Sequence, residues 1–164
     1  MGVSVHTTWG EIRLDTVAGE VVRCRLPDID QTPTTPFRIK ELLGDGDDGG
    51  TSGLTENSAR FMTKLFNGQP ASPPSYRFPE GSAFYQKVWR ALQDVPSGKT
   101  RTYGDIARQI GHPRAARAVG QACATNPLPL IIPCHRVLAA GNRPGGFTGG
   151  RAWKELLLDA EARG

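Results

Sequence analysis

Cysteine is scarce in this sequence and long apolar runs are missing, and each shortage excludes a class of protein. The 164 residues include three cysteines, Cys24, Cys123 and Cys134, too few and too widely spaced for the disulfide framework of a small secreted domain. No run approaches the roughly 20 apolar residues of a membrane span. The stretch from Met1 to His6 lacks the basic segment and apolar core of a secretory signal. We therefore expect no membrane association and a reducing, cytoplasmic setting in which the thiols stay free.

Metal-binding patterns are also missing. The sequence contains neither a C-x-x-C nor an H-x-x-x-H spacing. A tetrahedral structural zinc site needs four ligands, and His6 and Cys24 supply only two in the first part of the chain. We expect no metal and no cofactor.

Charge is present in both signs but is unevenly distributed. Residues 1–80 carry 8 basic and 11 acidic side chains, a balance of −3, whereas residues 81–164 carry 12 basic and 5 acidic side chains, a balance of +7. A basic half suggests an anionic partner, and phosphate backbones are the obvious candidate. On charge alone, arginines that merely solvate the surface are an equally good explanation.

The first part of the chain reads as a small sheet. Alternating apolar and polar residues indicate three strands separated by glycine-containing turns. These strands are residues 3–7, 11–17 and 21–26. A short helix is predicted at residues 37–43, a flexible acidic loop at residues 45–50, and a second helix that ends at Gly68. The prolines of residues 69–79 indicate a linker, so residues 1–78 are predicted to form an N-terminal domain with an antiparallel sheet.

The second part, residues 79–164, is predicted to be a mostly helical C-terminal domain. Ser82 can cap one helix, and Thr102 can cap a second helix that ends at Gly111. A third helix is predicted to start at Pro113. Two short helices joined in this way form a helix-turn-helix. The expected fold class is therefore α+β, with the sheet in one domain and the helix-turn-helix in the other.

A thiol and an imidazole stand side by side in the segment Pro133-Cys134-His135-Arg136-Val137. A thiol becomes a good nucleophile only as thiolate, so it needs a nearby base or positive charge. Histidine is the side chain that exchanges protons near neutral pH. The apolar residues 130–132 can hold the pair in a fixed place. Taken alone, such a pair is most often a buried structural cysteine beside a polar neighbour.

Three motifs, in order along the chain, resemble those of the O6-alkylguanine-DNA alkyltransferases, also called methylated-DNA–protein-cysteine methyltransferases. The motifs are residues 98–107, residues 115–120, and Asn126-Pro127-Leu128-Pro129 together with residues 133–137. The resemblance runs from about Phe84 to Glu161, and more weakly across the N-terminal half. It implies DNA repair by direct damage reversal, in which an alkyl group moves irreversibly from guanine O6 to Cys134. Because a thioether is not hydrolysed, such a protein reacts once.

The same resemblance implies a partner. This is double-stranded DNA containing O6-alkylguanine, bound from the minor-groove side with the damaged base flipped out of the stack. It also implies a monomer that associates with the nucleoid when bound to DNA. The sequence leaves open whether O4-alkylthymine is a second substrate and which alkyl sizes are accepted.

The predicted recognition helix has a smooth exposed face. At 100° per residue, Ala116, Arg117 and Gly120 project away from the apolar side of that helix. A major-groove reader would carry several long polar side chains there, so this face indicates sequence-tolerant binding. The resemblance implies that Arg117 fills the gap left by the extruded nucleotide. It also implies that Tyr103 contacts a phosphate and donates a proton to the leaving guanine, although its ring also fits the core side of its own helix.

His135 is the expected base for Cys134. Adjacent residues point in different directions, so their adjacency does not guarantee direct contact, and the resemblance implies a bridging water between them. A charged imidazole needs a carboxylate to orient it, and Glu161 is the candidate because it falls at the edge of the apolar stripe of the last helix. The alternative for Glu161 is an ordinary solvated side chain. Asn126 begins a tight turn, and the resemblance implies that it links the DNA-binding helix to the active site.

The glycine-rich segment 145–150 permits close approach of the backbone to a planar base. The resemblance implies that this segment, from Gly145 onward, forms a wall of the lesion pocket and that Thr148 supplies a hydroxyl to the guanine oxygen. Phe147 stands where many relatives have tyrosine, which keeps stacking and removes one donor. Pro129 and the Pro144-Gly145 pair indicate a pocket with room for groups larger than methyl.

Three other functions are compatible with parts of the sequence. The main alternative is a sensor that binds alkylated DNA without chemistry, but known proteins of that type lack the cysteine found here at position 134. A cysteine hydrolase built on Cys134, His135 and Glu161 would not need a helix-turn-helix. A plain transcriptional regulator would not need the Pro-Cys-His-Arg segment.

Overall fold

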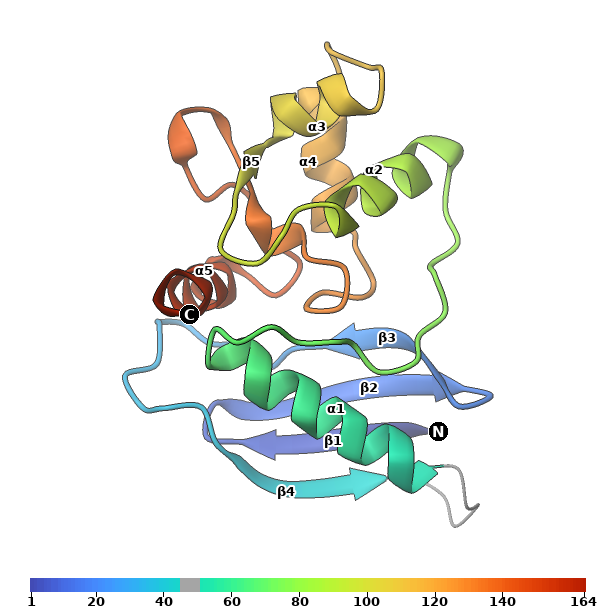
Figure 1. Ribbon diagram of the computed structural model, residues 1–164, viewed down its shortest axis with the longest axis vertical. Helices are drawn as coiled ribbons and strands as arrows, with labels where there is room; N and C mark the ends of the chain where they lie inside the picture. The colour runs from blue at the N-terminus through green and yellow to red at the C-terminus, as the bar shows by residue number, and fades with distance from the viewer. Residues whose placement is uncertain (45–50) are drawn as a thin grey trace.

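The computed structural model describes residues 1–44 and 51–164 and places a helical layer over a four-stranded sheet (Figure 1). The strands are β1 (Gly2–Thr7), β2 (Gly10–Val17), β3 (Glu20–Arg25) and β4 (Ile39–Gly44). Their order is β3-β2-β1-β4, and all neighbours are antiparallel. The helices are α1 (Thr51–Phe66), α2 (Ala83–Gln93), α3 (Tyr103–Gln109), α4 (Ala116–Ala124) and α5 (Arg151–Arg163). The predicted α+β class is confirmed.

The sheet buries one face beneath α1, as Figure 1 shows. Because side chains alternate along a strand, Val3 and Val5 of β1 and Ile12 and Leu14 of β2 point to the same face and are fully buried. They meet the buried residues of α1, which are Leu54, Phe61, Met62, Leu65 and Phe66. The three strands predicted from alternation are confirmed to within a residue or so. The predicted acidic loop, residues 45–50, lies outside the described residues.

The predicted helix at residues 37–43 is wrong. Residues Ile39–Gly44 form β4, an edge strand antiparallel to β1. An isolated helix of seven residues is marginal in water, whereas this segment gains a ladder of backbone hydrogen bonds along the open edge of β1. Leu42 and Leu43 are both partly exposed, so these leucines do not form the buried apolar face that would stabilise a helix here.

Both predicted helix caps in the second half are confirmed. The hydroxyl of Ser82 accepts a hydrogen bond from the backbone of Tyr85 at 3.2 Å at the start of α2. Thr102 and Asp105 form a reciprocal capping box at the start of α3, each side chain accepting from the other's backbone N–H. These caps fix where the first two C-terminal helices begin.

The helix-turn-helix consists of α3 and α4, but α4 starts at Ala116 rather than at Pro113. The backbone of Ala115 donates to the carbonyl of His112 at 2.9 Å, so the residues between them form a β-turn. Proline suits the second position of such a turn because its φ is already set. The proline therefore makes the turn, and the helix begins after it.

The two halves of the chain share one continuous buried cluster. The indole of Trp153 in α5 donates to the carbonyl of Pro27 at 2.7 Å, and the backbone of Cys24 in β3 donates to Pro127 at 2.9 Å. Helix α5 also packs against α1. The division into residues 1–78 and 79–164 stays a prediction. Among the described helices, none is long and apolar enough to cross a membrane.

Candidate active site

Cys134 opens a short 3-10 turn, Cys134–Arg136, that leads into strand β6 (Val137–Leu138). Strand β6 pairs in parallel with β5 (Arg101–Thr102), directly before the helix-turn-helix. The side chain of Cys134 is fully buried. Burial raises the pKa of its thiol to about 11, and this rise is opposed by a hydrogen bond from Asn126 and by the charge of Lys154. The resting cysteine is therefore a thiol at neutral pH and needs a base to ionise.

Asn126 closes the turn that leads to the cysteine. Its amide nitrogen Nδ2 lies 2.9 Å from the carbonyl of Ile132 and 3.2 Å from the Sγ atom of Cys134. Its Oδ1 accepts from the backbone of Leu128 at 3.0 Å. The side chain is completely buried. The turn that follows α4 is thus tied through one amide to the reactive sulfur.

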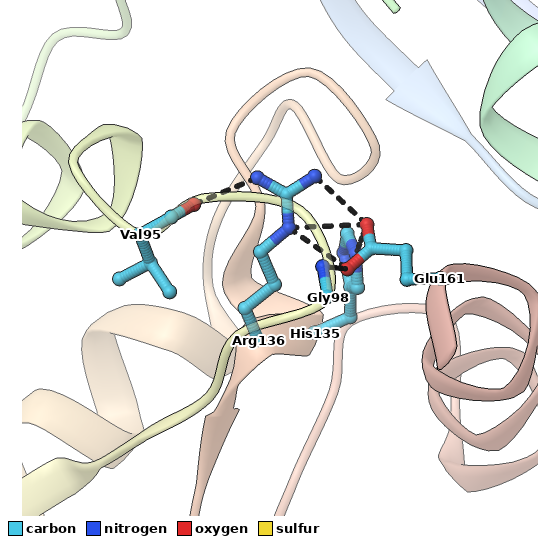
Figure 2. A network of polar contacts seen from close by, with 5 residues as sticks. All are labelled: Val95, Gly98, His135, Arg136 and Glu161. Atoms are coloured by element: carbon cyan, nitrogen blue, oxygen red, sulfur yellow. Dashed lines mark hydrogen bonds and ion pairs between the residues drawn. The ribbon is translucent and has the colours of Figure 1, made fainter. Parts of the chain in front are cut away.

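His135 and Glu161 are brought together across the fold, from the 3-10 turn and from α5 (Figure 2). The ring Nε2 of His135 lies 2.7 Å from Glu161 Oε1. Burial lowers the pKa of His135, although the hydrogen bond to Glu161 opposes this effect. The imidazole is therefore neutral at neutral pH, with its proton on Nε2 facing the carboxylate. The lone pair is left on Nδ1, the one buried side-chain nitrogen or oxygen of the described residues without a hydrogen-bond partner.

Arg136 clamps the same carboxylate. Its Nε lies 3.0 Å from both oxygens of Glu161, and its Nη2 lies 2.8 Å from Oε1. Its Nη1 donates to the carbonyl of Val95 at 2.8 Å, and the backbone of Gly98 donates to Glu161 Oε2 at 3.2 Å, as Figure 2 shows. Burial alone would raise the pKa of Glu161, but the hydrogen bonds from His135 and Arg136 hold it at about 2. Glu161 is an ionised carboxylate with every oxygen satisfied.

Lys154 of α5 is a second charged group inside the site. Its side chain is fully buried, and its Nζ donates to the carbonyls of Val137 at 2.5 Å and Gly146 at 3.2 Å. Within the described part of the chain, no carboxylate lies within ion-pair distance of it. Burial lowers the pKa of Lys154, and the negative charge that Cys134 carries once ionised acts against this lowering. The anion that can best compensate this ammonium is the Cys134 thiolate.

Tyr103, the first residue of α3, lies between α4 and the glycine-rich segment. An added Cβ on Gly120 would come 3.4 Å from the Tyr103 ring, and one on Gly145 would come 2.4 Å from its hydroxyl. Gly145 also has a φ of +68°, so both its conformation and its contact require glycine. The Tyr103 hydroxyl donates to Gly146 O at 3.3 Å, the carbonyl that Lys154 also binds. Burial raises the pKa of Tyr103 to about 12, so the hydroxyl keeps its proton.

The remaining residues predicted to line the pocket are Phe147 and Thr148 of the glycine-rich segment and Pro129 of the turn before the cysteine. The hydroxyl of Thr148 lies 3.2 Å from each of three carbonyls at the end of α4, those of Cys123, Ala124 and Asn126. Phe147 is buried in the core, and Pro129 is buried in the turn before the cysteine. The structure therefore ties this segment to the end of α4.

The predicted DNA-reading residues lie on α4. Arg117 is exposed, whereas Ala116 and Gly120 are half-buried. Gly120 faces the Tyr103 ring, so the lack of a side chain there serves packing between α3 and α4. Arg117 is left as the long side chain that projects from the start of this helix.

Two residues of the site, Arg136 and Lys154, have no role in the sequence-based prediction. Arg136 stands next to His135, and nothing in its spacing points to a shared carboxylate. Lys154 could have been found, because it precedes Leu157 by three residues and Glu161 by seven. Residues with this spacing share one face of a helix, so the lysine lies on the buried side of α5.

A family model described as 6-O-methylguanine DNA methyltransferase, DNA binding domain, matches residues 83–163. The methylated-DNA–protein-cysteine methyltransferase of Methanosarcina acetivorans is 44% identical over 104 residues, which cover 63% of this chain and 67% of the relative. That of Mycolicibacterium paratuberculosis is 53% identical over 83 residues, which cover 51% of this chain and 50% of the relative. The chain thus spans about half to two thirds of these curated relatives.

Several solved structures are similar over nearly the whole chain. Among them is Mycobacterium tuberculosis OGT in complex with DNA, with a TM-score of 0.76 and 33% identity over 97% of this chain and 91% of that one. An O6-methylguanine DNA methyltransferase from Methanococcus jannaschii has a TM-score of 0.61 and 29% identity, covering 93% of this chain and 88% of that one. The similarity therefore includes the N-terminal sheet.

The lowered pKa values of His135 and Glu161 predict that the folded protein becomes less stable in acid. Unfolding returns His135 to its ordinary pKa near 6.5 and Glu161 to one near 4.5. Because both pKa values are lower in the folded protein, the unfolded chain binds protons that the folded protein does not, and stability falls as pH falls below about 6.5. Each proton contributes at most about 1.4 kcal/mol per pH unit, so urea titrations should show a loss of up to about 2 kcal/mol between pH 7.5 and pH 5. The exposed-histidine variant His112→Asn should keep this slope, and a flat profile would contradict the neutral His135.

Proposed function

The chain belongs to the 6-O-methylguanine DNA methyltransferase family, and we propose that it repairs DNA by transferring an alkyl group from guanine O6 to the sulfur of Cys134. The observation that carries this proposal is the buried thiol of Cys134, held by Asn126 beside a neutral His135 whose Nδ1 has no partner. The proposed partner is double-stranded DNA with an O6-alkylated guanine. The proposed location is the cytoplasm.

The first step is ionisation of the thiol. The Cys134 proton passes to Nδ1 of His135, through a bridging water as the adjacency of the two residues suggests. The imidazolium that forms keeps its Nε2–H on Glu161, and the ionised carboxylate stabilises its charge. The thiolate in turn keeps the N–H of Asn126 and lies in the field of Lys154. This step separates charge inside the protein without changing the total.

The second step is an in-line displacement at carbon. The thiolate forms the new carbon–sulfur bond, the carbon–oxygen bond breaks, and its electron pair moves onto guanine O6 and into the ring. Tyr103, still protonated at neutral pH, donates to the leaving guanine. The proton held by His135 is then transferred through solvent to the Tyr103 phenolate, which restores the neutral imidazole and the phenol. The net result moves the alkyl group to sulfur and the thiol proton to guanine.

DNA binding is proposed for the surface formed by α3 and α4. In α4 the exposed arginine is Arg117, and the residues predicted to share its face, Ala116 and Gly120, are small. Such a face suits minor-groove docking, where the base must be flipped out before chemistry can begin, and Arg117 would fill the space that the base leaves. Thr148 is a proposed donor to the guanine oxygen, and to serve it the hydroxyl must release its carbonyl partners at the end of α4.

The direct test is incubation with duplex DNA containing O6-methylguanine, followed by mass spectrometry of the peptide that holds Cys134. We expect the gain of one methyl group per protein molecule, with no second turnover. Cys134→Ser should abolish transfer, and Cys123→Ser should retain it. Multiple turnovers, or a methyl group on Cys24 or Cys123, would contradict the proposal.

Lys154 is expected to act through the charge state of Cys134. Lys154→Met keeps the length of the side chain and removes the cation, so the pKa of the thiol should rise. A rise of about one unit lowers the thiolate population roughly tenfold. Single-turnover methyl transfer should therefore be about tenfold slower at pH 7.5 and should recover as the pH is raised.

The matched control is Lys64→Met, which removes an exposed lysine from α1 and should leave the pH profile unchanged. Lys154→Met also removes the donor to the buried carbonyl of Val137, which costs about 1–3 kcal/mol of stability if that carbonyl is left unpaired. A purely structural loss would lower the rate equally at every pH. That result would contradict the electrostatic role.

A further inference from the structure

A cavity of about 380 Å³ lies between the two halves of the molecule, next to the site. On one side it is lined by the turn Asn126–Pro129 and by Thr148 and Gly149 of the glycine-rich segment. On the other side it is lined by the end of β3 and the residues that follow, including Cys24 and Leu26. The N-terminal domain therefore supplies one wall of a space that borders the reaction centre.

This wall is held rigidly against the C-terminal half. The backbone of Cys24 donates to Pro127 at 2.9 Å, and the carbonyl of Pro27 accepts from the Trp153 indole at 2.7 Å. Between them, Leu26 contacts the glycine-rich segment, because a Cβ on Gly149 would come 2.6 Å from its Cδ1. The segment from Cys24 to Pro27 is thus held against the C-terminal half at both of its ends.

The cavity is connected to the chemistry through Asn126. This residue lines the cavity, and its Nδ2 lies 3.2 Å from the sulfur of Cys134. Cys134 itself is fully buried and does not line the cavity. In an in-line displacement the reacting carbon lies between O6 and sulfur, so a methyl group needs no further space. A larger substituent on that carbon needs further space, and the cavity that borders Asn126 and Pro129 is space next to the sulfur.

The chemistry of the wall suits apolar substituents. Cys24 is buried, and burial raises the pKa of its thiol far above its usual range. Cys24 therefore contributes an uncharged thiol to the wall. Leu26 and Pro129 are apolar. Arg23, Arg25 and Asp28 lie at the rim, where Arg25 is paired with Asp15 at 2.6 Å. A cavity of roughly 150 Å³ is sufficient for benzene, so an arylalkyl group fits the available volume.

We propose that the segment Cys24–Leu26, which comprises the last two residues of β3 and the residue after them, determines which O6 substituents the protein accepts, by forming the wall against which groups larger than methyl pack. The proposal rests on the proposed alkyl transfer and adds to it an N-terminal segment that discriminates between substituents by their size. Leu26 sets the depth of the cavity. The N-terminal half is then a specificity element as well as a support.

The test compares single-turnover transfer from duplex DNA containing O6-methylguanine with transfer from the same duplex containing O6-benzylguanine. Leu26→Trp fills the cavity and should lower the benzyl-to-methyl rate ratio by about tenfold or more, the range expected when a pocket rejects a group by size. Leu26→Ala deepens it and should raise the ratio severalfold. The matched control, Leu43→Trp, adds the same bulk on β4 at the opposite edge of the sheet and should leave the ratio unchanged.

The ratio within one preparation cancels any loss of folded protein, and the two Leu26 variants shift it in opposite directions. If both variants keep the wild-type ratio while methyl transfer proceeds, the specificity role of the segment Cys24–Leu26 is wrong and the proposed function stands. If the wild-type protein transfers neither group to Cys134, the proposed function itself fails.

Discussion

The carboxylate of Glu161 is the constraint on which the rest of the site depends. It is buried in α5 and satisfied by His135, Arg136 and the backbone of Gly98. These partners come from the 3-10 turn that begins at Cys134 and from the loop between α2 and β5. Through Arg136 the network also reaches the end of α2 at Val95. Breaking such a buried pair by removing one partner typically costs about 3–5 kcal/mol, because the other charge is left uncompensated.

The same cluster determines the protonation states at rest. Burial lowers the pKa of His135 and keeps the ring neutral, although the hydrogen bond to Glu161 opposes this, and that hydrogen bond places the proton on the carboxylate side. On the other side of the site, Lys154 is a buried cation without a carboxylate partner among the described residues. The charge of Lys154 is therefore compensated only when Cys134 is ionised to the thiolate. The resting thiol is inert, and the protein is organised to stabilise the thiolate once the base takes its proton.

Much of this arrangement could be predicted from the sequence, because it depends on local patterns. Strand alternation, the caps at Ser82 and Thr102, and the apolar stripe of α5 each follow from residues within one or two turns. Asn126 and Glu161 were named from the same patterns and from the resemblance, and the structure places both in contact with the Cys134–Arg136 turn.

What could not be predicted depends on contacts between distant segments. The edge strand β4 forms because β1 offers it a partner, which no local pattern of residues 37–43 reveals. Arg136 acquires its role only when α5 brings Glu161 beside it. The hydroxyl of Thr148 turns toward α4 because three carbonyls meet there. The cavity wall at Leu26 exists only once the two halves of the chain pack together.

The central claim is that burial holds His135 neutral, while the hydrogen bond to Glu161 places its proton on Nε2 and leaves a free lone pair on Nδ1. The most direct measurement is 15N NMR of the histidine ring nitrogens in the free protein at pH 7, assigned with a His135→Gln variant. The account predicts the shifts of a neutral ring, with the protonated nitrogen at Nε2 and an unprotonated Nδ1. An imidazolium, or a proton on Nδ1, would leave no base for Cys134 and would contradict the account.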